Sequence, residues 1–168
     1  MGSEDIIVKV AEGFIEKQKP GLIGVLSSGL SEVKGDDISE AIKRFRMQDT
    51  GLKIIHIPTP DYEGGMETGY AKAVEAVLKG TLTKRKKEIK GQINVLAGLH
   101  LTPADFNELR EIIESFGLCP VLLPDLPALD GSREGFSPLA SGGVKTGEIE
   151  TMNSSMFTIA VGMSMEAP

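Results

Sequence analysis

The chain is poor in the side chains that hold metals and form disulfides. Its 168 residues include one cysteine, Cys119, and two histidines, His56 and His100. A lone cysteine excludes an internal disulfide framework and is usual in a reducing compartment, so we expect a cytoplasmic protein. These three side chains are widely separated and lack paired-ligand spacing, so the sequence predicts no metal site of its own.

Long apolar runs and an excess of positive charge are also absent. No run approaches the length that spans a bilayer and no signal peptide is visible, so we expect no membrane contact. The formal net charge of −6 disfavours a nucleic-acid partner. The basic run Lys84-Arg85-Lys86-Lys87 could meet nucleic acid, but a solvated helix end explains it more simply.

Familiar catalytic and nucleotide-binding patterns are missing as well. The sequence has no Gly-x-x-x-x-Gly-Lys-Ser/Thr phosphate loop, no dinucleotide fingerprint and no legible nucleophile–base arrangement. The pair Asp36-Asp37 could bind a metal or serve in acid–base chemistry, but helix capping explains both residues more simply. We therefore name no catalytic residue.

What the chain does have is a regular alternation of short apolar runs and amphipathic segments. The runs predict five strands, at 22–26, 53–57, 93–98, 119–123 and 156–161. The spacing predicts helices over 4–18, 36–46, 67–79, from Thr102-Pro103 to Gly117, and over 147–154. This order predicts one three-layer α/β/α domain over residues 1–168, Rossmann-like or flavodoxin-like, with a mostly parallel sheet of four or five strands.

One predicted helix and the C-terminal end give more detailed expectations. The helix that begins at Thr102 should have Thr102 as its N-cap and Pro103 at its first position. Its expected buried side chains are Phe106, Leu109, Ile112, Ile113 and Phe116. The last apolar run is followed by residues 162–168 without a closing element, so we expect the chain to be a fragment of a longer subunit.

The loops that follow the predicted strands are the candidate binding regions, because α/β folds place ligands at the carboxyl ends of their strands. Ser27-Ser28-Gly29 follows the first strand, and His100 follows the third and could face a ligand. His56 lies inside a strand, where a structural, hydrogen-bonded histidine is the simpler interpretation. The connection 124–145 is long and rich in Pro, Gly, Asp and Ser, which is typical of a functional or disordered loop.

Three separated segments resemble the nitrogenase component 1 family and occur in that family's order. The first is Ser-Ser-Gly-Leu-Ser-Glu-Val-Lys-Gly-Asp-Asp-Ile at 27–38, and the second is Pro-Thr-Pro-Asp-Tyr-Glu-Gly-Gly-Met-Glu-Thr-Gly-Tyr at 58–70. The third is the long connection, from Leu123-Pro124-Asp125-Leu126 through Leu129-Asp130-Gly131 to Ser141-Gly142-Gly143. Subunits of that family have three α/β domains, and the resemblance implies that this chain is the middle one.

Two positions depart from the family's catalytic β subunit. Gly29 stands where that subunit has a cysteine that ligates the P-cluster, and Gly65 stands where it has a serine near the same cluster. Glycine offers no side-chain ligand, so the resemblance implies that this chain does not hold a P-cluster in the β-subunit manner. Gly29, Gly65 and His100 are then the candidate cofactor-facing residues, the glycines by leaving room. Simple turn geometry remains the alternative for both glycines.

The third segment most resembles the NifN type, the iron–molybdenum cofactor biosynthesis branch of the family. The resemblance implies a scaffold for nitrogen fixation that pairs with a NifE-type subunit as a heterotetramer and meets the nitrogenase iron protein. The parent complex would carry an iron–sulfur cluster and the cofactor precursor, with none bound by this fragment alone. The family is of the oxidoreductase type, yet a scaffold subunit needs no catalytic residue of its own.

Other functions stay open at this point. The chain could belong to a β subunit of the dinitrogenase molybdenum–iron protein, or to a related reductase subunit of the chlorophyll pathway. It could also be a free-standing flavodoxin-like ligand-binding domain, in which case the purified chain would carry flavin or nucleotide. The sequence does not distinguish a molybdenum pathway from a vanadium pathway.

Overall fold

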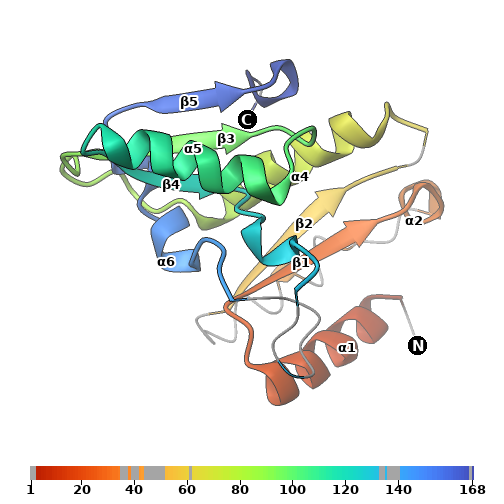
Figure 1. Ribbon diagram of the computed structural model, residues 1–168. Helices are drawn as coiled ribbons and strands as arrows, with labels where there is room; N and C mark the ends of the chain where they lie inside the picture. The colour runs from red at the N-terminus through yellow and green to blue at the C-terminus, as the bar shows by residue number, and fades with distance from the viewer. Residues whose placement is uncertain are drawn as a thin grey trace. The chain divides into compact units, whose positions relative to one another are not determined.

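The computed structural model describes residues 3–34, 38, 42–43, 52–60, 62–132, 135, 141–166 and 168. The chain divides into two compact units, Met1–Gly80 and Thr81–Pro168. Each unit contains its own parallel sheet (Figure 1). The expectation of a single domain that is a fragment of a three-domain subunit stays a prediction.

The first unit is built on a two-stranded sheet. Its elements in chain order are α1 (Ser3–Gln18), β1 (Leu22–Ser27), α2 (Gly29–Lys34), β2 (Lys53–Pro58) and α4 (Met66–Thr81), the last of which ends one residue beyond the unit. Strands β1 and β2 are parallel and pair from Leu22 with Lys53 to Ser27 with Pro58. Ala11 of α1 packs with Ile38, Ile42 and Ile54 in the buried core of this unit.

The second unit is built on a three-stranded parallel sheet in the order β4-β3-β5. Its strands and α-helices are β3 (Gln92–Ala97), α5 (Pro103–Ser115), β4 (Cys119–Leu123), α6 (Thr146–Ile149) and β5 (Thr158–Val161). Short 3₁₀ turns lie at Pro127–Leu129, Met152–Ser154 and Met163–Glu166.

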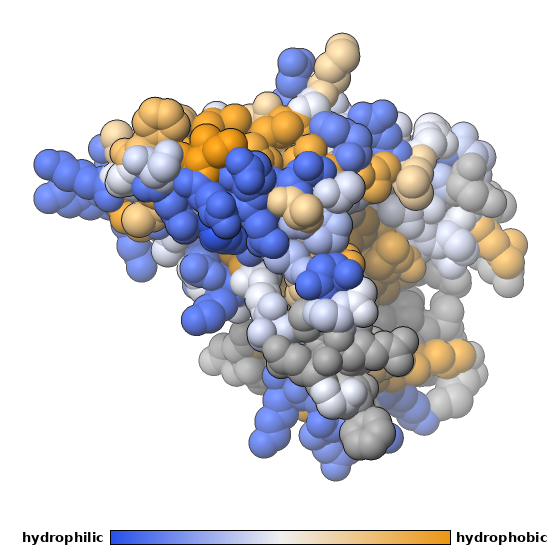
Figure 2. Space-filling model, in the orientation of Figure 1, coloured by the Kyte–Doolittle hydropathy of each residue, from blue (hydrophilic) through white to orange (hydrophobic). Residues whose placement is uncertain are grey.

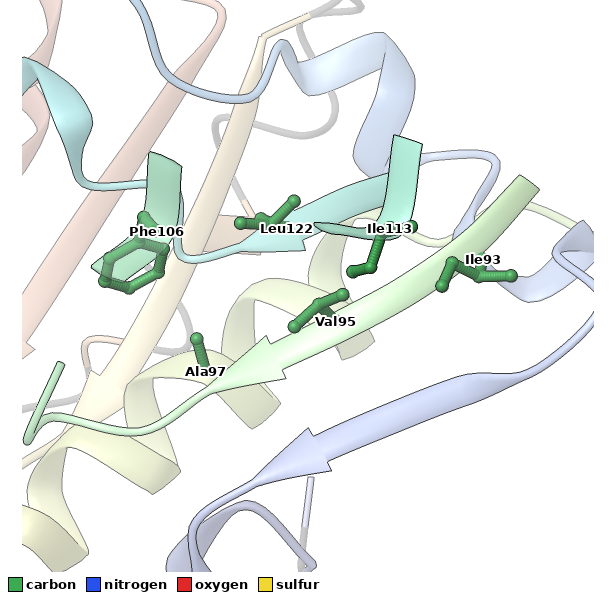
Figure 3. Close-up of a cluster of buried hydrophobic side chains, with 6 residues drawn as sticks. All are labelled: Ile93, Val95, Ala97, Phe106, Ile113 and Leu122. Atoms are coloured by element: carbon green, nitrogen blue, oxygen red, sulfur yellow. The ribbon is translucent and has the colours of Figure 1, made fainter. Parts of the chain in front are cut away.

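The core of the second unit forms between the sheet and α5. Phe106 and Ile113 extend from α5 toward the side chains of β3 and β4 (Figure 3). Phe106 has no exposed surface, and Ile93, Val95 and Leu122 are each 1% exposed. Burying side chains of this size contributes about 1.5–3 kcal/mol each, so this cluster holds α5 on the sheet.

Helix α5 begins as the sequence predicts. Thr102 is the N-cap and Pro103 is the first helical residue. The backbone N–H and the hydroxyl of Thr102 both donate to Asp105 Oδ2, at 2.7 and 2.8 Å, and Asp105 N–H donates to Thr102 Oγ1 at 3.4 Å. This reciprocal capping box fixes the start of the helix at Pro103, six residues after the last residue of β3.

The α/β class and the parallel pairing are confirmed, and the five strands are distributed over two sheets. The predicted helix over 147–154 is wrong, because the chain there forms α6 followed by a separate 3₁₀ turn. Helix α2 was not predicted. The expected helix over 36–46 lies largely outside the described residues, as does the pair Asp36-Asp37.

Of the α5 side chains expected to be buried, Phe106 and Ile113, which face the sheet, are buried. Ile112 is 46% exposed and Phe116 is 77% exposed, so both predictions of burial were wrong. Phe106 and Ile113 are two helical turns apart and face the sheet together, whereas Ile112 is rotated by about 100° from Ile113. The space-filling view shows apolar and hydrophilic surface side by side on this face of the molecule (Figure 2).

A search of the described helices for a membrane span found none that is long and apolar enough.

Candidate functional site at the carboxyl edges of the sheets

The carboxyl ends of β1 and β2 are tied together by hydrogen bonds around Ser27. Thr59 donates twice to the carbonyl oxygen of Ser27, from its backbone N–H at 3.2 Å and from its hydroxyl at 3.0 Å. His56 Nε2 lies 3.1 Å from the Ser27 hydroxyl. His56 is therefore a hydrogen-bonded histidine of the sheet, as the sequence suggested. The hydrogen bonds of Thr59 and His56 to Ser27 hold the ends of β1 and β2 together.

The two candidate glycines of the first unit lie in the segments that leave this edge. Gly29 is buried and is the first residue of α2, two residues beyond the end of β1. Gly65 is exposed and directly precedes α4. The parallel register aligns the ends of β1 and β2, so both segments begin at one edge of one sheet.

Gly64 and Gly65 differ in what they require of the chain. Gly64 has φ +71°, and a Cβ there would lie 2.8 Å from Thr68 Oγ1, so the turn needs glycine at this position. At Gly65, φ is not in the left-handed region and a Cβ would meet nothing within 4 Å. The contacts of the described residues therefore do not require glycine at position 65.

His100 lies at the carboxyl edge of the second sheet and rests on two glycines. A Cβ on Gly98 would lie 2.9 Å from both Cε1 and Nδ1 of His100, and a Cβ on Gly162 would lie 2.9 Å from Cε1. Gly98 N–H donates to the carbonyl oxygen of Val161 at 2.8 Å, which joins the ends of β3 and β5. The imidazole therefore occupies a position that any larger residue at 98 or 162 would obstruct.

The topology makes this a natural binding position. From β3 the chain passes through α5 to β4 on one side, and it later returns to β5 on the other side of β3. In open α/β sheets, ligands bind in the crevice where the strand order reverses in this way, outside the carboxyl ends of the strands. His100 is exposed at that edge, between the ends of β3 and β5.

The charged group near His100 is the carboxylate of Asp105, which belongs to the capping box of α5. The backbone N–H of Thr102 is the main cause that lowers the pKa of Asp105, followed by the Thr102 hydroxyl, and His100 contributes a smaller electrostatic effect in the same direction. Asp105 therefore stays ionised at neutral pH and is committed to the helix cap.

These edges do not offer the ligand set of an iron–sulfur cluster. Such clusters are held by cysteine thiolates. Cys119 is the first residue of β4 and pairs with Gln92, so it lies at the opposite, amino edge of the sheet. Among the described residues, no group of three His, Cys, Asp or Glu side chains could hold a metal ion. The residues present therefore do not fit the cluster that the family implies, and no step through such a group follows from them.

Two features of the site escaped the sequence reasoning. The first is the role of Gly98 and Gly162 beneath His100, although Gly98 ends one predicted strand and Gly162 directly follows another. The second is the ion pair between Arg110 and Asp125, at 2.7 Å. Its partners are 15 residues apart, and no helical spacing or motif connects them.

The comparisons with known proteins agree with the geometry. The family model for nitrogenase component 1 type oxidoreductases matches residues 1–168. The chain is 34% identical to the iron–molybdenum cofactor biosynthesis protein NifN of Rippkaea orientalis and 36% identical to that of a Nostoc species. Each alignment covers 98% of this chain, and the chain spans 39% and 38% of the length of these relatives.

A solved structure, "Nitrogenase Cp1 at pH 6.5", superposes on 96% of this chain with a TM-score of 0.86 at 27% identity, over 36% of the nitrogenase chain. A second, "Nitrogenase Cp1 at pH 5", gives a TM-score of 0.70 at 18% identity and supports the fold alone. The chain belongs to the nitrogenase component 1 family.

Proposed function

We propose that this chain is part of a scaffold subunit on which the iron–molybdenum cofactor of nitrogenase is built. The observation that carries the proposal is the similarity to NifN proteins over 98% of the chain at 34% and 36% identity. Because the chain spans about two fifths of their length, the activity belongs to the parent subunit. This chain contributes two small parallel sheets and the loops at their carboxyl edges.

The proposed partners follow from the same similarity. The parent subunit pairs with a NifE-type subunit in a heterotetramer in the cytoplasm, and the complex meets the nitrogenase iron protein. The cofactor precursor is the cargo of this complex. The thiolate ligands of its iron–sulfur cluster come from outside the described residues, since Cys119 is at the wrong edge of its sheet.

Gly29, Gly65 and His100 are the residues of this chain that we propose to face the cargo or the cluster. Gly65 gives the clearest support, because the described contacts leave space for a side chain there and yet none is present. The proposed role of Gly65 is to let the backbone approach a bulky group closely. His100 is the one side chain of the three that can donate or accept a hydrogen bond.

A catalytic β subunit of dinitrogenase is the second candidate, favoured by the 0.86 TM-score to a nitrogenase at 27% identity. The absence of a side chain at Gly29 and Gly65 opposes it. The two functions differ in what happens to dinitrogenase when the parent gene is lost.

The test is to delete the parent gene and purify dinitrogenase without air. For a scaffold, we expect both dinitrogenase subunits to be present with the P-cluster signal intact and molybdenum missing, and we expect the reintroduced gene to restore molybdenum. The disappearance of one dinitrogenase subunit would instead identify this chain as part of that subunit. Unchanged dinitrogenase would contradict both proposals and favour a free-standing binding domain.

A further inference from the structure

A polar cavity of about 350 Å³ lies beside β4 in the second unit. Its walls come from α5, from β4 and the residues that follow it, and from the segment 141–148. Two parts of the third family-like segment meet here, Asp125 from Leu-Pro-Asp-Leu and the pair Gly142-Gly143. The volume lies within the range of small-molecule sites in proteins.

Asp125 is the buried charge of this cavity. Its side chain is 4% exposed, and its Oδ2 accepts a hydrogen bond from Arg110 Nη2 at 2.7 Å. Its other oxygen, Oδ1, has less than 1 Å² of exposed surface and no hydrogen-bond partner among the described residues. Burying a carboxylate oxygen without a hydrogen bond costs folding free energy. A hydrogen-bond donor placed here would therefore be stabilising.

The charges that line the cavity do not balance. Among the described residues that line the cavity, Arg110 is the one cation and is paired with Asp125, while Glu148 adds a second carboxylate. Burial raises the pKa of Asp125; the nearby Arg110 opposes that rise and Glu148 adds to it. Glu148 Oε2 accepts from the backbone N–H of Lys145 at 2.8 Å, which holds this carboxylate in place at the start of α6.

The two glycines form part of the wall next to the backbone of Asp125. Gly142 and Gly143 have φ values of +135° and +88°, which side-chain-bearing residues rarely adopt. A Cβ on Gly143 would lie 3.6 Å from the carbonyl oxygen of Asp125, so the backbone passes close to the acidic residue. Carboxylate and backbone groups therefore line one part of the cavity, beside the apolar side chains of β4, and a compact hydrogen-bond donor suits this polar part.

We propose that this cavity binds a primary ammonium group, with Asp125 and Glu148 supplying its counter-charge. An ammonium group is a compact cation with three hydrogen-bond donors, which suits two carboxylates and nearby backbone oxygens. The charge of Asp125 attracts the occupant while Arg110 keeps its hydrogen bond to Oδ2, and the carboxylate of Glu148 accepts hydrogen bonds from the ammonium group. The group can come from a small amine or from a lysine side chain, and this inference does not depend on the proposed scaffold function.

The test is a titration of the full 168-residue chain with n-butylammonium chloride, followed by the amide NMR signals of Gly142 and Gly143. We expect saturable shifts with a dissociation constant in the millimolar range, reached by about 50 mM ligand. Because tetramethylammonium has the charge without N–H donors and butanol has neither, we expect weaker binding of the first and none of the second.

Two variants make the test specific. We expect Asp125→Asn to weaken binding about tenfold or more, because it removes a charge that attracts the ammonium group. Glu148→Gln changes a side chain on the rim, so it keeps the test valid if the buried variant does not fold, and we expect it to weaken binding severalfold. Equal affinity in Glu148→Gln and the parent chain, or no shift at 50 mM, would overturn the proposal.

A second ligand distinguishes a small amine from a lysine side chain as the source of the ammonium group. Nα-acetyl-lysine methylamide presents the same group on a peptide backbone. If it binds about tenfold more tightly than n-butylammonium, the natural occupant is a lysine side chain of a protein; equal affinity indicates a small amine. Shifts that are the same for butanol and n-butylammonium would mean that the ammonium charge has no part in binding, which also contradicts the proposal.

Discussion

At the scale of single residues, Gly98 determines where the imidazole of His100 lies. A methyl group at this position would lie 2.8 Å from the carbonyl oxygen of Val161 and 2.9 Å from the His100 ring. We expect Gly98→Ala to lower the free energy of unfolding by about 1–3 kcal/mol, as overpacking does, and to displace the ring. Urea unfolding and the imidazole NMR signals of His100 measure the two effects.

Gly65→Ala is the matched control for this change. Its added methyl group meets nothing within 4 Å and its backbone is not left-handed. We expect its stability to be unchanged or raised by about 0.4–1 kcal/mol, because alanine restricts the unfolded chain more than glycine. If both alanine variants lost the same stability, the close packing of His100 on Gly98 would be wrong.

Asp125 gives a prediction about pH. Its pKa is raised mainly by burial, so the folded chain holds this proton more tightly than the unfolded chain does. This group therefore lowers stability above its folded pKa, and that penalty disappears as the pH falls through it. We expect the free energy of unfolding of the parent chain, minus that of Asp125→Asn, to decrease between about pH 4 and pH 7. Urea unfolding across this range measures it, and the opposite slope would mean that Arg110 outweighs burial.

At the scale of elements, α4 contains two glycines with opposite environments. A Cβ on Gly80 would lie 2.7 Å from Ile55 Cγ1, whereas a Cβ on Gly69 would meet nothing within 4 Å. We expect Gly69→Ala to stabilise the chain by about 1 kcal/mol through helix propensity, and Gly80→Ala to destabilise it by about 1–3 kcal/mol. Thermal and urea unfolding of the pair would check this, and a gain in both variants would show that β2 can move away from α4.

The sequence predicted the strands well because each has a short apolar run between strong turn signals. Residues 119–123 were predicted without error, and β1 and β2 were predicted to within one residue. The short helices were harder to predict, because a segment of four to six residues shows too little side-chain periodicity. As a result, α2 was missed and α6 was joined to the 3₁₀ turn that follows it. Ile112 and Phe116 appeared to belong to the apolar face of α5, because periodicity does not show how wide the covering sheet is.

The candidate site was only partly predictable. His100 was placed correctly at the carboxyl end of a strand, because the parallel topology follows from the β-α alternation. The glycines beneath its ring and the Arg110–Asp125 pair depend on distances between segments far apart in the sequence. Their recognition required the structure, since no local pattern marks a residue that must be small because of a distant neighbour.

At the scale of the whole molecule, acidic charge and exposed apolar surface have opposite effects on association between copies of the chain. The 24 acidic and 18 basic side chains keep the chain negative at pH 7, and the charge approaches zero near the pI of about 5.0. Met156, Phe157 and Ile159 leave 45%, 47% and 38% of their surface exposed. Within the described residues β5 pairs with β3 alone, so it is an edge strand, and exposed apolar side chains lie on it and just before it. Such edges pair with other chains unless charge prevents it.

We therefore expect this chain to self-associate most strongly near pH 5 and Ile159→Lys to reduce that association, because a lysine on an edge strand opposes strand pairing. Light scattering across the pH range measures the association of both proteins. Gln18→Lys in α1 is the matched control, since it changes the net charge equally without altering β5. Each protein is compared at its own pI, where long-range repulsion is least. If the two lysine variants scattered equally there, net charge would explain the association and the exposed edge of β5 would have no part in it.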